Sequence, residues 1–301
     1  MSLKGRKILV TGGMGFIGVN LATELEQLGA DVTIFDLEKG DDIEDCKKLE
    51  STIKKRFDAI YHLAGFSGPS ESNKDVKKSF GINTFSTVDL CKLILKHSPK
   101  AKLVLSSSRL EYGKPKYLPV DEDHPTNPIS AYGLSKLTAT QMALVYNNRY
   151  GLDVTIFRTS NVYGPHKKKQ FPGYNIINDF IDKAKRGETL TIYGDGNQGR
   201  DYIYVDDLVE AFTAAAKNPN ISSGQIYNLG YGKGIKFKNM VSLISNKAGK
   251  GEIEFVPWPK SYKDVETGSY ISDISKIKKQ LGFSPKIGFE EGIVKTIQAQ
   301  R

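Results

Sequence analysis

The sequence predicts an α/β fold in which a doubly wound parallel sheet is followed by a smaller C-terminal lobe. Two observations lead to this prediction. Short apolar runs typical of strands alternate with helical patterns between residues 6 and 158, and this order builds a parallel sheet covered on both faces. After Gly164-Pro165 the alternation stops and a Gly- and Lys-rich loop begins. With 301 residues, the chain is long enough to bury a large core.

A glycine-rich turn follows the first predicted strand, residues 6–11, and opens a helical pattern that runs to residue 28. One glycine permits a tight turn, a second lets a pyrophosphate approach the backbone, and a third lets the helix pack on the strand. The helix N-terminus then faces the phosphates. The turn therefore predicts a Rossmann-type dinucleotide site with contacts from Gly12, Gly15, Phe16, Ile17 and Gly18.

The second predicted strand, residues 31–36, ends in Asp36, about 20 residues after the glycines. A carboxylate there accepts hydrogen bonds from both ribose hydroxyls and repels a 2′-phosphate, so we expect NAD rather than NADP. Only residues 37–42 separate Asp36 from Ile43, which indicates that a helix and strand of the usual repeat are compressed or missing. We expect Asp42 and Ile43 along the adenine edge of the cofactor, with Asp41 as the alternative.

The strand predicted at residues 59–65 ends in Leu63, Ala64 and Gly65, and small residues there allow a cofactor to approach the backbone closely. His62 precedes them. A single histidine at a strand end is more often structural than catalytic, so we assign it no chemistry. A long helix containing Asn83 follows, and the next strand, residues 102–105, ends in Ser106-Ser107-Ser108.

Tyr132 and Lys136 are four residues apart, so a helix at this segment places both side chains on one face. A free tyrosine has a pKa of about 10, and a fixed cation nearby favours the phenolate. We therefore predict that Lys136 lowers the pKa of Tyr132 and makes it a proton carrier at neutral pH. The same spacing occurs by chance in surface helices, so this prediction depends on the upstream motifs.

The composition, with 39% hydrophobic and 26% charged residues, is that of an ordinary globular protein. The net charge of +9 comes from lysines in small clusters rather than one basic stripe, which argues against nucleic-acid binding. The sequence has no apolar run long enough for a membrane span and no secretion leader, so we expect a cytoplasmic protein. Cys46 and Cys91 suit neither a disulfide framework nor a metal site, and we expect no metal.

We predict a cofactor-binding domain at residues 1–165 and a ligand-binding lobe at residues 166–301. A helix at residues 176–186, a strand at 189–193 and a turn at 194–197 belong to the second lobe. Because no low-complexity linker separates the parts, we expect the chain to cross between them, with segments near 203–231 returning to the first domain.

Several motifs occur in order across nearly the whole chain: Thr11-Gly-Gly-Met-Gly-Phe-Ile-Gly18, Asp36, His62-Leu-Ala-Gly65, Asn83, Ser106-Ser-Ser108, Tyr132-Gly-Leu-Ser-Lys136, Arg158-Thr-Ser-Asn-Val-Tyr-Gly-Pro165, Gly194-Asp-Gly196, Arg200-Asp-Tyr-Ile-Tyr-Val-Asp-Asp207 and Asp273-Ile-Ser-Lys276. Together they resemble the extended short-chain dehydrogenase/reductase family, specifically its NAD-dependent nucleotide-sugar epimerases and dehydratases, of the UDP-glucose 4-epimerase kind.

The resemblance implies roles for these residues. Tyr132 takes a proton from a sugar hydroxyl while a hydride passes to bound nicotinamide, Lys136 holds the nicotinamide ribose, and Ser108 hydrogen-bonds the same sugar oxygen. The implied cofactor contacts include Leu63, Ala64, Gly65, Asn83, Ser106, Tyr132 and Lys136. The implied substrate contacts are Ser72, Arg109, Asn161, Leu190, Tyr193 and Arg200.

Asn161 and Arg200 look like diphosphate contacts, and Leu190 and Tyr193 like residues that flank the base. Asn161 also suits a purely structural loop role, and Arg200 could instead pair with Asp201 or Asp206.

Some positions depart from the family pattern. Dehydratases carry an Asp and a Glu after the equivalent of Ser108, whereas this chain has Arg109 and Leu110, so we do not expect dehydration. The family usually has a C-terminal arginine that contacts the diphosphate, and this chain has Lys260 or Ser261 in its place. We expect loops at residues 66–72, 109–111 and 166–174 to select the sugar.

We therefore expect a nucleotide-sugar 4-epimerase, with a UDP-sugar as the favoured substrate. The alternatives are a 4-ketoreductase or 4-dehydrogenase with net redox change and a UDP-uronate decarboxylase. The intact Ser108, Tyr132 and Lys136 argue against a non-catalytic NAD sensor. The helices carrying Asn83 and Tyr132 resemble those through which this family dimerises, so we also expect a homodimer.

Overall fold

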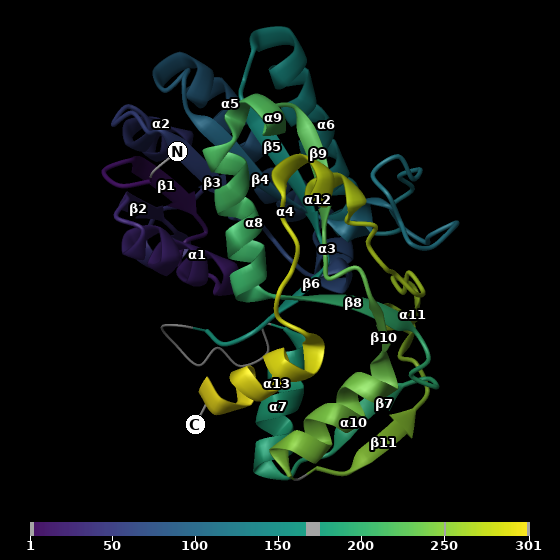
Figure 1. Cartoon of the computed structure of the whole chain (residues 1–301). Helices are drawn as coiled ribbons and strands as arrows, with labels where there is room; N and C mark the ends of the chain where they lie inside the picture. Colours follow the sequence, from purple (N-terminus) through teal and green to yellow (C-terminus); the bar gives the residue numbers. More distant parts are fainter. Residues whose placement is uncertain (1–2, 167–174, 250, 300–301) are drawn as a thin grey trace.

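A parallel sheet of six strands, in the order β2-β1-β3-β4-β5-β9, forms the centre of the molecule (Figure 1). The computed structural model describes residues 3–166, 175–249 and 251–299. The strands of this sheet are β1 (Lys7–Thr11), β2 (Asp31–Phe35), β3 (Ala59–His62), β4 (Lys102–Ser108), β5 (Val154–Thr159) and β9 (Gln225–Leu229). All neighbouring strands run parallel, which confirms the predicted α/β class.

Each face of the sheet is covered by its own helices. One layer contains α1 (Phe16–Gln27), α8 (Val205–Lys217) and α12 (Ser275–Leu281), and the other α2 (Cys46–Ile53), α5 (Ser86–His97) and α6 (Ala131–Tyr150). Because successive strand residues point to opposite faces, Ile8 and Val10 pack with the first layer and Leu9 packs with the second. The sheet is therefore doubly wound, as predicted.

The connection after β2 is short. It contains a single 3-10 turn, Leu37–Lys39 (η1), and α2, after which β3 pairs on the other side of β1. The helix and strand of the usual repeat are missing here, as the sequence indicated. The chain reverses its winding direction between β1 and β3, and ligands of open α/β sheets bind in the crevice at such a point.

The helical segment before β4 contains one wide turn. It comprises α3 (Pro69–Lys74), α4 (Val76–Phe80), a π-helical turn at Gly81–Phe85 (η2), and α5. The sequence predicted one continuous helix, and it gave no sign of the π turn. Asn83 lies within this turn, and single π turns occur most often at functional sites.

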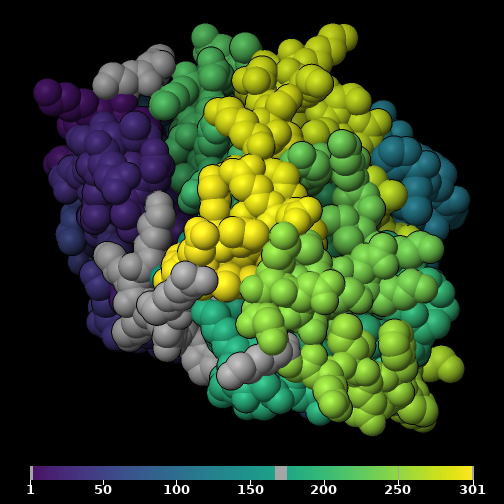
Figure 2. All heavy atoms as spheres, turned by 60° about the horizontal axis from the view of Figure 1, so that its bottom comes forward, coloured from purple at the N-terminus to yellow at the C-terminus, as the bar shows by residue number. Residues whose placement is uncertain are grey.

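The second lobe has its own core and two small sheets, ordered β10-β8-β6 and β11-β7. Its elements are β6 (Asn161–Tyr163), α7 (Ile176–Arg186), β7 (Leu190–Tyr193), β8 (Gly199–Tyr204), β10 (Gly234–Lys236), α10 (Phe237–Ala248), β11 (Ile253–Val256), α11 (Lys260–Lys263) and α13 (Phe289–Ala299). Figure 2 shows the yellow C-terminal segment lying against the light green residues, and α13 packs on α10.

The chain crosses between the lobes more than once. After β8, α8, the short α9 (Pro219–Ser222) and β9 return to the central sheet, where residues 225–229 pair with residues 155–159 of β5. The chain then re-enters the second lobe at β10 (Figure 1). Among the described residues, none of the helices is long and apolar enough to cross a membrane.

Candidate active site at the carboxyl ends of the strands

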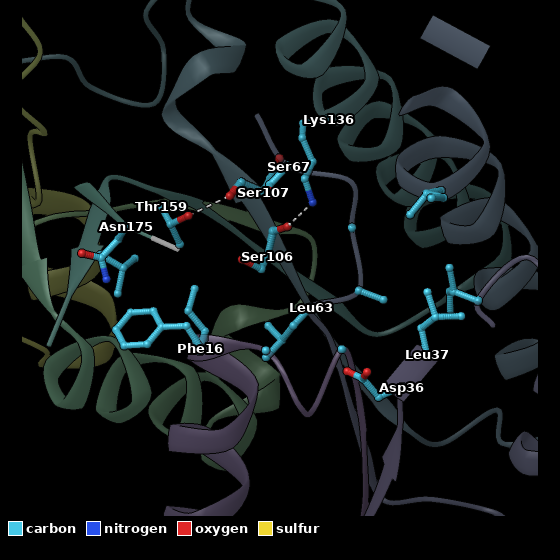
Figure 3. Close-up of a pocket in the computed structure, with 18 of the residues that line it drawn as sticks. Phe16, Asp36, Leu37, Leu63, Ser67, Ser106, Ser107, Lys136, Thr159 and Asn175 are labelled. Atoms are coloured by element: carbon cyan, nitrogen blue, oxygen red, sulfur yellow. Dashed lines mark hydrogen bonds between the residues drawn. The ribbon is translucent and has the colours of Figure 1, made fainter. Parts of the chain in front are cut away.

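A cavity of about 730 Å³ lies at the carboxyl ends of the first five strands. Figure 3 shows Asp36 and Leu37 at one end of it and Phe16 and Asn175 at the other. Most of the predicted cofactor residues line this cavity, namely Gly12, Gly15, Phe16, Ile17, Asp36, Asp42, Ile43, Leu63, Ala64, Gly65, Ser106, Tyr132 and Lys136. Asn161 of the substrate set lines it as well.

Glycine is present at the three positions of the first turn for different physical reasons. Gly12 has a φ of +66°, and a Cβ on it would lie 2.6 Å from the Ala64 nitrogen. A Cβ on Gly18 would lie 2.2 Å from the Gly12 oxygen. Gly15, with a φ of −69°, would meet nothing closer than 3.4 Å. The fold therefore requires Gly12 and Gly18, whereas the space in front of Gly15 is left for a ligand.

The start of α1 is suited to bind an anion. Gly15 is the N-cap residue of this helix and Phe16 its first residue, and no side chain caps the N-terminus. The first N–H groups of a helix lack intrahelical partners and carry partial positive charge, so they favour phosphate.

Asp36 is held in place at the end of β2. One carboxylate oxygen accepts the Met14 N–H at 2.9 Å and the other accepts the Glu38 N–H at 2.9 Å. These two bonds tie the carboxylate to the glycine-rich turn and to η1. The remaining acceptor capacity faces the cavity, where ribose hydroxyls can donate to it.

The predicted adenine end contains all three candidate residues. Asp41, Asp42 and Ile43 each line the cavity, so the structure does not choose between Asp42 and its alternative Asp41. Asp41 is engaged by the Lys48 amine, whose Nζ lies 2.7 Å from the carboxylate.

Asn83 supports the cavity from outside its lining. Its side chain accepts the Phe66 N–H at 2.8 Å and donates to the Phe66 carbonyl at 3.1 Å and to the Ser135 hydroxyl at 2.9 Å. It is 2% exposed and does not line the cavity. Asn83 therefore ties the loop after β3 to α6, the helix that carries Tyr132 and Lys136.

Tyr132 and Lys136 lie one turn apart at the start of α6. The helix begins at Ala131, and the Ser130 hydroxyl caps it by accepting the Gly133 N–H at 3.1 Å. The Lys136 amine donates to the Ser106 carbonyl at 3.0 Å, as Figure 3 shows. Lys136 is thus fixed against the end of β4.

One prediction about this pair is wrong for the protein alone. Burial raises the pKa of Tyr132, and a hydrogen bond with Ser108 opposes that rise. Lys136 is not among the groups that lower the pKa of Tyr132, and its amine donates to the Ser106 carbonyl instead. Burial also lowers the pKa of Lys136 itself, to about 8.

Ser108 ends β4 and caps the 3-10 turn Arg109–Glu111 (η3), accepting the Leu110 N–H at 3.2 Å. Ser108 is 8% exposed and does not line the cavity directly.

A buried polar network that the sequence did not reveal supports this region. Glu111 is fully buried, and its carboxylate accepts hydrogen bonds from the Ser107 hydroxyl, from Thr140 at 2.6 Å and from Arg158 Nε at 2.7 Å. Thr159 also donates to the Ser107 carbonyl, at 2.8 Å. The network fixes β4 against α6 and β5, and thereby sets where Ser108 stands.

His62 is structural, as predicted. Its ring contacts the hydroxyls of Thr11 at 2.7 Å and Thr87 at 3.1 Å. Burial lowers the pKa of His62 to about 3, so the ring is neutral at physiological pH.

On the substrate side, Arg200 is paired inside the protein. Its Nη2 lies 2.6 and 2.7 Å from the two carboxylate oxygens of Glu266, and its Nη1 donates to the Gly268 carbonyl at 2.5 Å. The alternatives Asp201 and Asp206 were the wrong partners. Asp201 instead accepts three backbone N–H groups.

Two other substrate predictions are wrong. Leu190 and Ser72 have no exposed surface and neither lines the cavity, so the structure places neither of them at the ligand site. Along β7, Leu190 and Ile192 point into the core while Thr191 and Tyr193 alternate outward. Ser72 is enclosed because α3 packs on α6.

Tyr193 and Asn161 keep accessible surface. Tyr193 is partly exposed and packs beside Trp258 and Tyr262, with ring centroids 5.7 and 5.6 Å away. Asn161 donates to the Asp201 carbonyl at 2.8 Å and also lines the cavity, so its structural role and a ligand contact are compatible.

The cavity also has walls that sequence reasoning missed, among them Ser107, Thr159, Asn175 and Tyr202. Tyr202 lies within a motif that we had singled out for Arg200, and the strand alternation of that motif was the available signal. Residues 167–174, most of one predicted specificity loop, lie outside the described residues.

The site fits a dinucleotide with an unphosphorylated ribose. Gly15 leaves space at a helix N-terminus, Asp36 offers a carboxylate beside it, and the cavity continues to Lys136. A sequence model of the NAD-dependent epimerase/dehydratase family matches residues 8–230. The chain belongs to this family. NAD is therefore its cofactor, and its fold is that of the family's Rossmann-type enzymes.

Relatives of this NAD-dependent family member have several activities in their names. The chain is 33% identical to a putative UDP-glucose 4-epimerase of Methanocaldococcus jannaschii, over 96% of this chain and 97% of the relative. It is 32% identical to UDP-glucuronic acid decarboxylase 1 of Danio rerio, over 99% of this chain and 73% of the relative. The structure of UDP-glucose 4-epimerase from Thermotoga maritima with UDP-glucose superimposes with a TM-score of 0.90, at 30% identity and 98% coverage of both chains.

Proposed function

We propose that this protein is an NAD-dependent nucleotide-sugar 4-epimerase that acts on a UDP-sugar. The observation that carries the proposal is the arrangement of Tyr132 and Lys136, one turn apart on α6 and lining a cavity that fits NAD. Ser108 ends β4 close enough to Tyr132 to oppose the rise in the pKa of Tyr132 that burial causes. The relatives named as UDP-glucose 4-epimerases support both the reaction and the nucleotide.

Each catalytic residue has a defined task in this proposal. NAD, when bound, supplies the hydride acceptor and donor. As the phenolate, Tyr132 removes the proton from the C4 hydroxyl of the sugar, and the Ser108 hydroxyl hydrogen-bonds the same oxygen and holds it in place. The positive charge of oxidised nicotinamide, when bound nearby, would favour this phenolate and offset the rise in pKa that burial causes. Lys136 binds the nicotinamide ribose. The 4-ketosugar then rotates in the site so that its other face meets the cofactor. The hydride returns to C4 on that face and Tyr132 returns the proton to the oxygen, so the overall reaction is redox-neutral.

The residues that follow Ser108 support epimerisation over dehydration. Removal of water from the sugar needs a general acid and a general base, and neither Arg109 nor Leu110 can act as such a pair. Glu111, the carboxylate of this segment, is fully buried and bonded to Arg158. A buried carboxylate with these partners cannot reach the sugar.

The test is a turnover screen of the purified protein with NAD against UDP-, dTDP-, GDP- and CDP-sugars, with products resolved by NMR. We expect interconversion of C4 epimers with no net change in NADH absorbance. If no sugar in the panel is interconverted at C4, the proposal is overturned.

The same screen separates the rival reactions. Stoichiometric consumption or formation of NADH or NADPH identifies a 4-ketoreductase or 4-dehydrogenase. Release of carbon dioxide from a UDP-uronate identifies a decarboxylase, the activity named for a relative of 32% identity.

We also propose a homodimer through the helices that carry Asn83 and Tyr132. Leu134 and Val145 of α6 are both 46% exposed and, being eleven residues apart, lie on one face of the helix. Phe85, the last residue of the π turn that packs on α6, is 63% exposed. Light scattering should give twice the monomer mass, and Val145→Asp should reduce it to the monomer mass. An unchanged monomer mass for the unmodified protein refutes this assembly.

A further inference from the structure

Arg109 is a partly buried cation that makes no ion pair with a carboxylate among the residues that the structure describes. Its Nη1 donates to the Thr267 hydroxyl at 3.1 Å, and its guanidinium lies over the ring of Tyr270, 5.2 Å from the centroid. Within the described ranges, none of the ion pairs involves Arg109. The residue is only partly exposed, and burial lowers its pKa to about 10.

The two neighbouring arginines are different. Arg158 contacts Glu111 at 2.7 Å, and Arg200 contacts Glu266 at 2.6 Å. Removing a charge from water is costly unless an opposite charge and hydrogen bonds compensate for it, and both of these arginines have that compensation. Among the described residues, Arg109 has a hydrogen bond to Thr267 and the charge of Glu266 acts on it without an ion pair, so its remaining donors can serve an anion of a ligand.

A second, independent observation lies beside it. The hydroxyl of Tyr202 is buried and has no hydrogen-bond partner among the described residues. Tyr202 is 4% exposed and lines the cavity. The positive charges of Arg200 and Arg109 both act on this hydroxyl. A buried phenol without an acceptor is unfavourable, so its position at the cavity wall points to an acceptor on a ligand.

Arg109 and Tyr202 lie where the sugar of the substrate is expected. Arg109 directly follows Ser108, and its charge acts on Tyr132. On its other side, Arg109 donates to Thr267, which lies between Glu266 and Gly268, the two residues that bind Arg200. Under the proposed function, on which this step rests, Ser108 and Tyr132 hold the reacting sugar oxygen and Arg200 lies near the diphosphate. Arg109 and Tyr202 then lie between these two points, along the sugar ring.

We propose that Arg109 and Tyr202 form a subsite for a carboxylate on the sugar, so that the substrate is a nucleotide-activated uronic acid rather than a neutral hexose. A guanidinium donates two parallel hydrogen bonds to a carboxylate, and the phenol donates a third. A neutral hydroxymethyl group in the same place leaves the Arg109 charge uncompensated.

The test measures affinity rather than turnover. The NAD-loaded protein is titrated by calorimetry with UDP, UDP-glucose and UDP-glucuronate, or with the matching set of whichever nucleotide binds best in the substrate panel. UDP-glucuronate should bind about tenfold or more tightly than UDP-glucose, as expected for a charge-assisted pair. Arg109→Gln and Tyr202→Phe should each reduce this preference and leave the affinity for UDP within about twofold. Arg186→Gln, on the exposed end of α7, is the matched control and should change none of the three affinities.

Two results would overturn the subsite. The first is a uniform loss of affinity for all three ligands in Arg109→Gln, which would make Arg109 a diphosphate contact. The second is an unmodified protein that binds the neutral sugar as tightly as the acidic one. The proposed 4-epimerase activity fails separately: a preference for UDP-glucuronate that depends on Arg109, without interconversion of C4 epimers, supports the subsite and refutes the reaction.

Discussion

Replacing Lys136 by Met should stabilise the cofactor-free protein at pH 7 while abolishing its activity. Lys136 is 8% exposed, and burial lowers its pKa from 10.5 to about 8. A methionine side chain has a similar length and fills the same space without a charge. Under the proposed function, Lys136 is therefore held at a cost to the stability of the fold, a common trade-off in catalytic sites.

The size of this effect follows from the pKa. A fall from 10.5 to about 8 corresponds to a cost of about 3 kcal/mol at pH 7. The variant loses the hydrogen bond from Lys136 to the Ser106 carbonyl, worth about 1 kcal/mol. The net gain for Lys136→Met is thus about 2 kcal/mol in the free energy of unfolding.

The gain should depend on pH in a defined direction. Because the pKa of Lys136 is lower in the folded than in the unfolded protein, the unfolded chain binds more protons between about pH 8 and 10.5. The unmodified protein therefore gains stability relative to the variant as the pH rises through this window. By about pH 9.5 the cost has fallen to about 1 kcal/mol, and the two proteins should be almost equally stable.

Urea unfolding of the two nucleotide-free proteins at pH 7 and pH 9.5 measures this difference. The exposed Lys55→Met is the control and should change stability by less than about 0.5 kcal/mol at either pH. A Lys136→Met variant that is less stable at pH 7, or a difference that does not change with pH, would refute the reasoning.

Three further predictions concern the site. Tyr132→Phe should abolish turnover and leave the NAD content, measured by absorbance after denaturation, unchanged; turnover at the original rate would contradict the catalytic role. Gly18→Ala should destabilise the protein, since its Cβ would lie 2.2 Å from a backbone oxygen, whereas Gly15→Ala should fold normally in thermal melts and lose NAD affinity. Arg158→Met leaves the Glu111 charge buried without its ion-pair partner and should lower the free energy of unfolding by about 3–5 kcal/mol, a loss that Glu111→Gln in the same chain should partly restore.

The sequence was informative wherever neighbours along the chain decide the outcome. The glycine-rich turn, Asp36 at the end of its strand, and the spacing of Tyr132 and Lys136 were all predicted, and the structure places them around one cavity. These features depend on strand and helix periodicity and on the φ angles of a few residues. The parallel, doubly wound sheet followed from the same alternation.

Tertiary structure decided the partners of charged and polar groups. Arg200 pairs with Glu266, 66 residues away, and the sequence offered Asp201 and Asp206 because they were close along the chain. Likewise, Asn83 bonds the backbone of Phe66 rather than lining the cavity. Such pairings depend on which strands and loops meet in the folded protein, and periodicity within a single element does not contain that information.

The sequence by itself determined the fold class, the glycine-rich turn and the spacing of Tyr132 and Lys136, because each is encoded in contiguous residues. Only the tertiary structure decided the direction of the pKa shift of Tyr132 and the lack of a carboxylate partner for Arg109 among the described residues. Both depend on desolvation and on charges brought together from distant segments. Burial of a charge is a property of the assembled protein, and a sequence pattern does not reveal it.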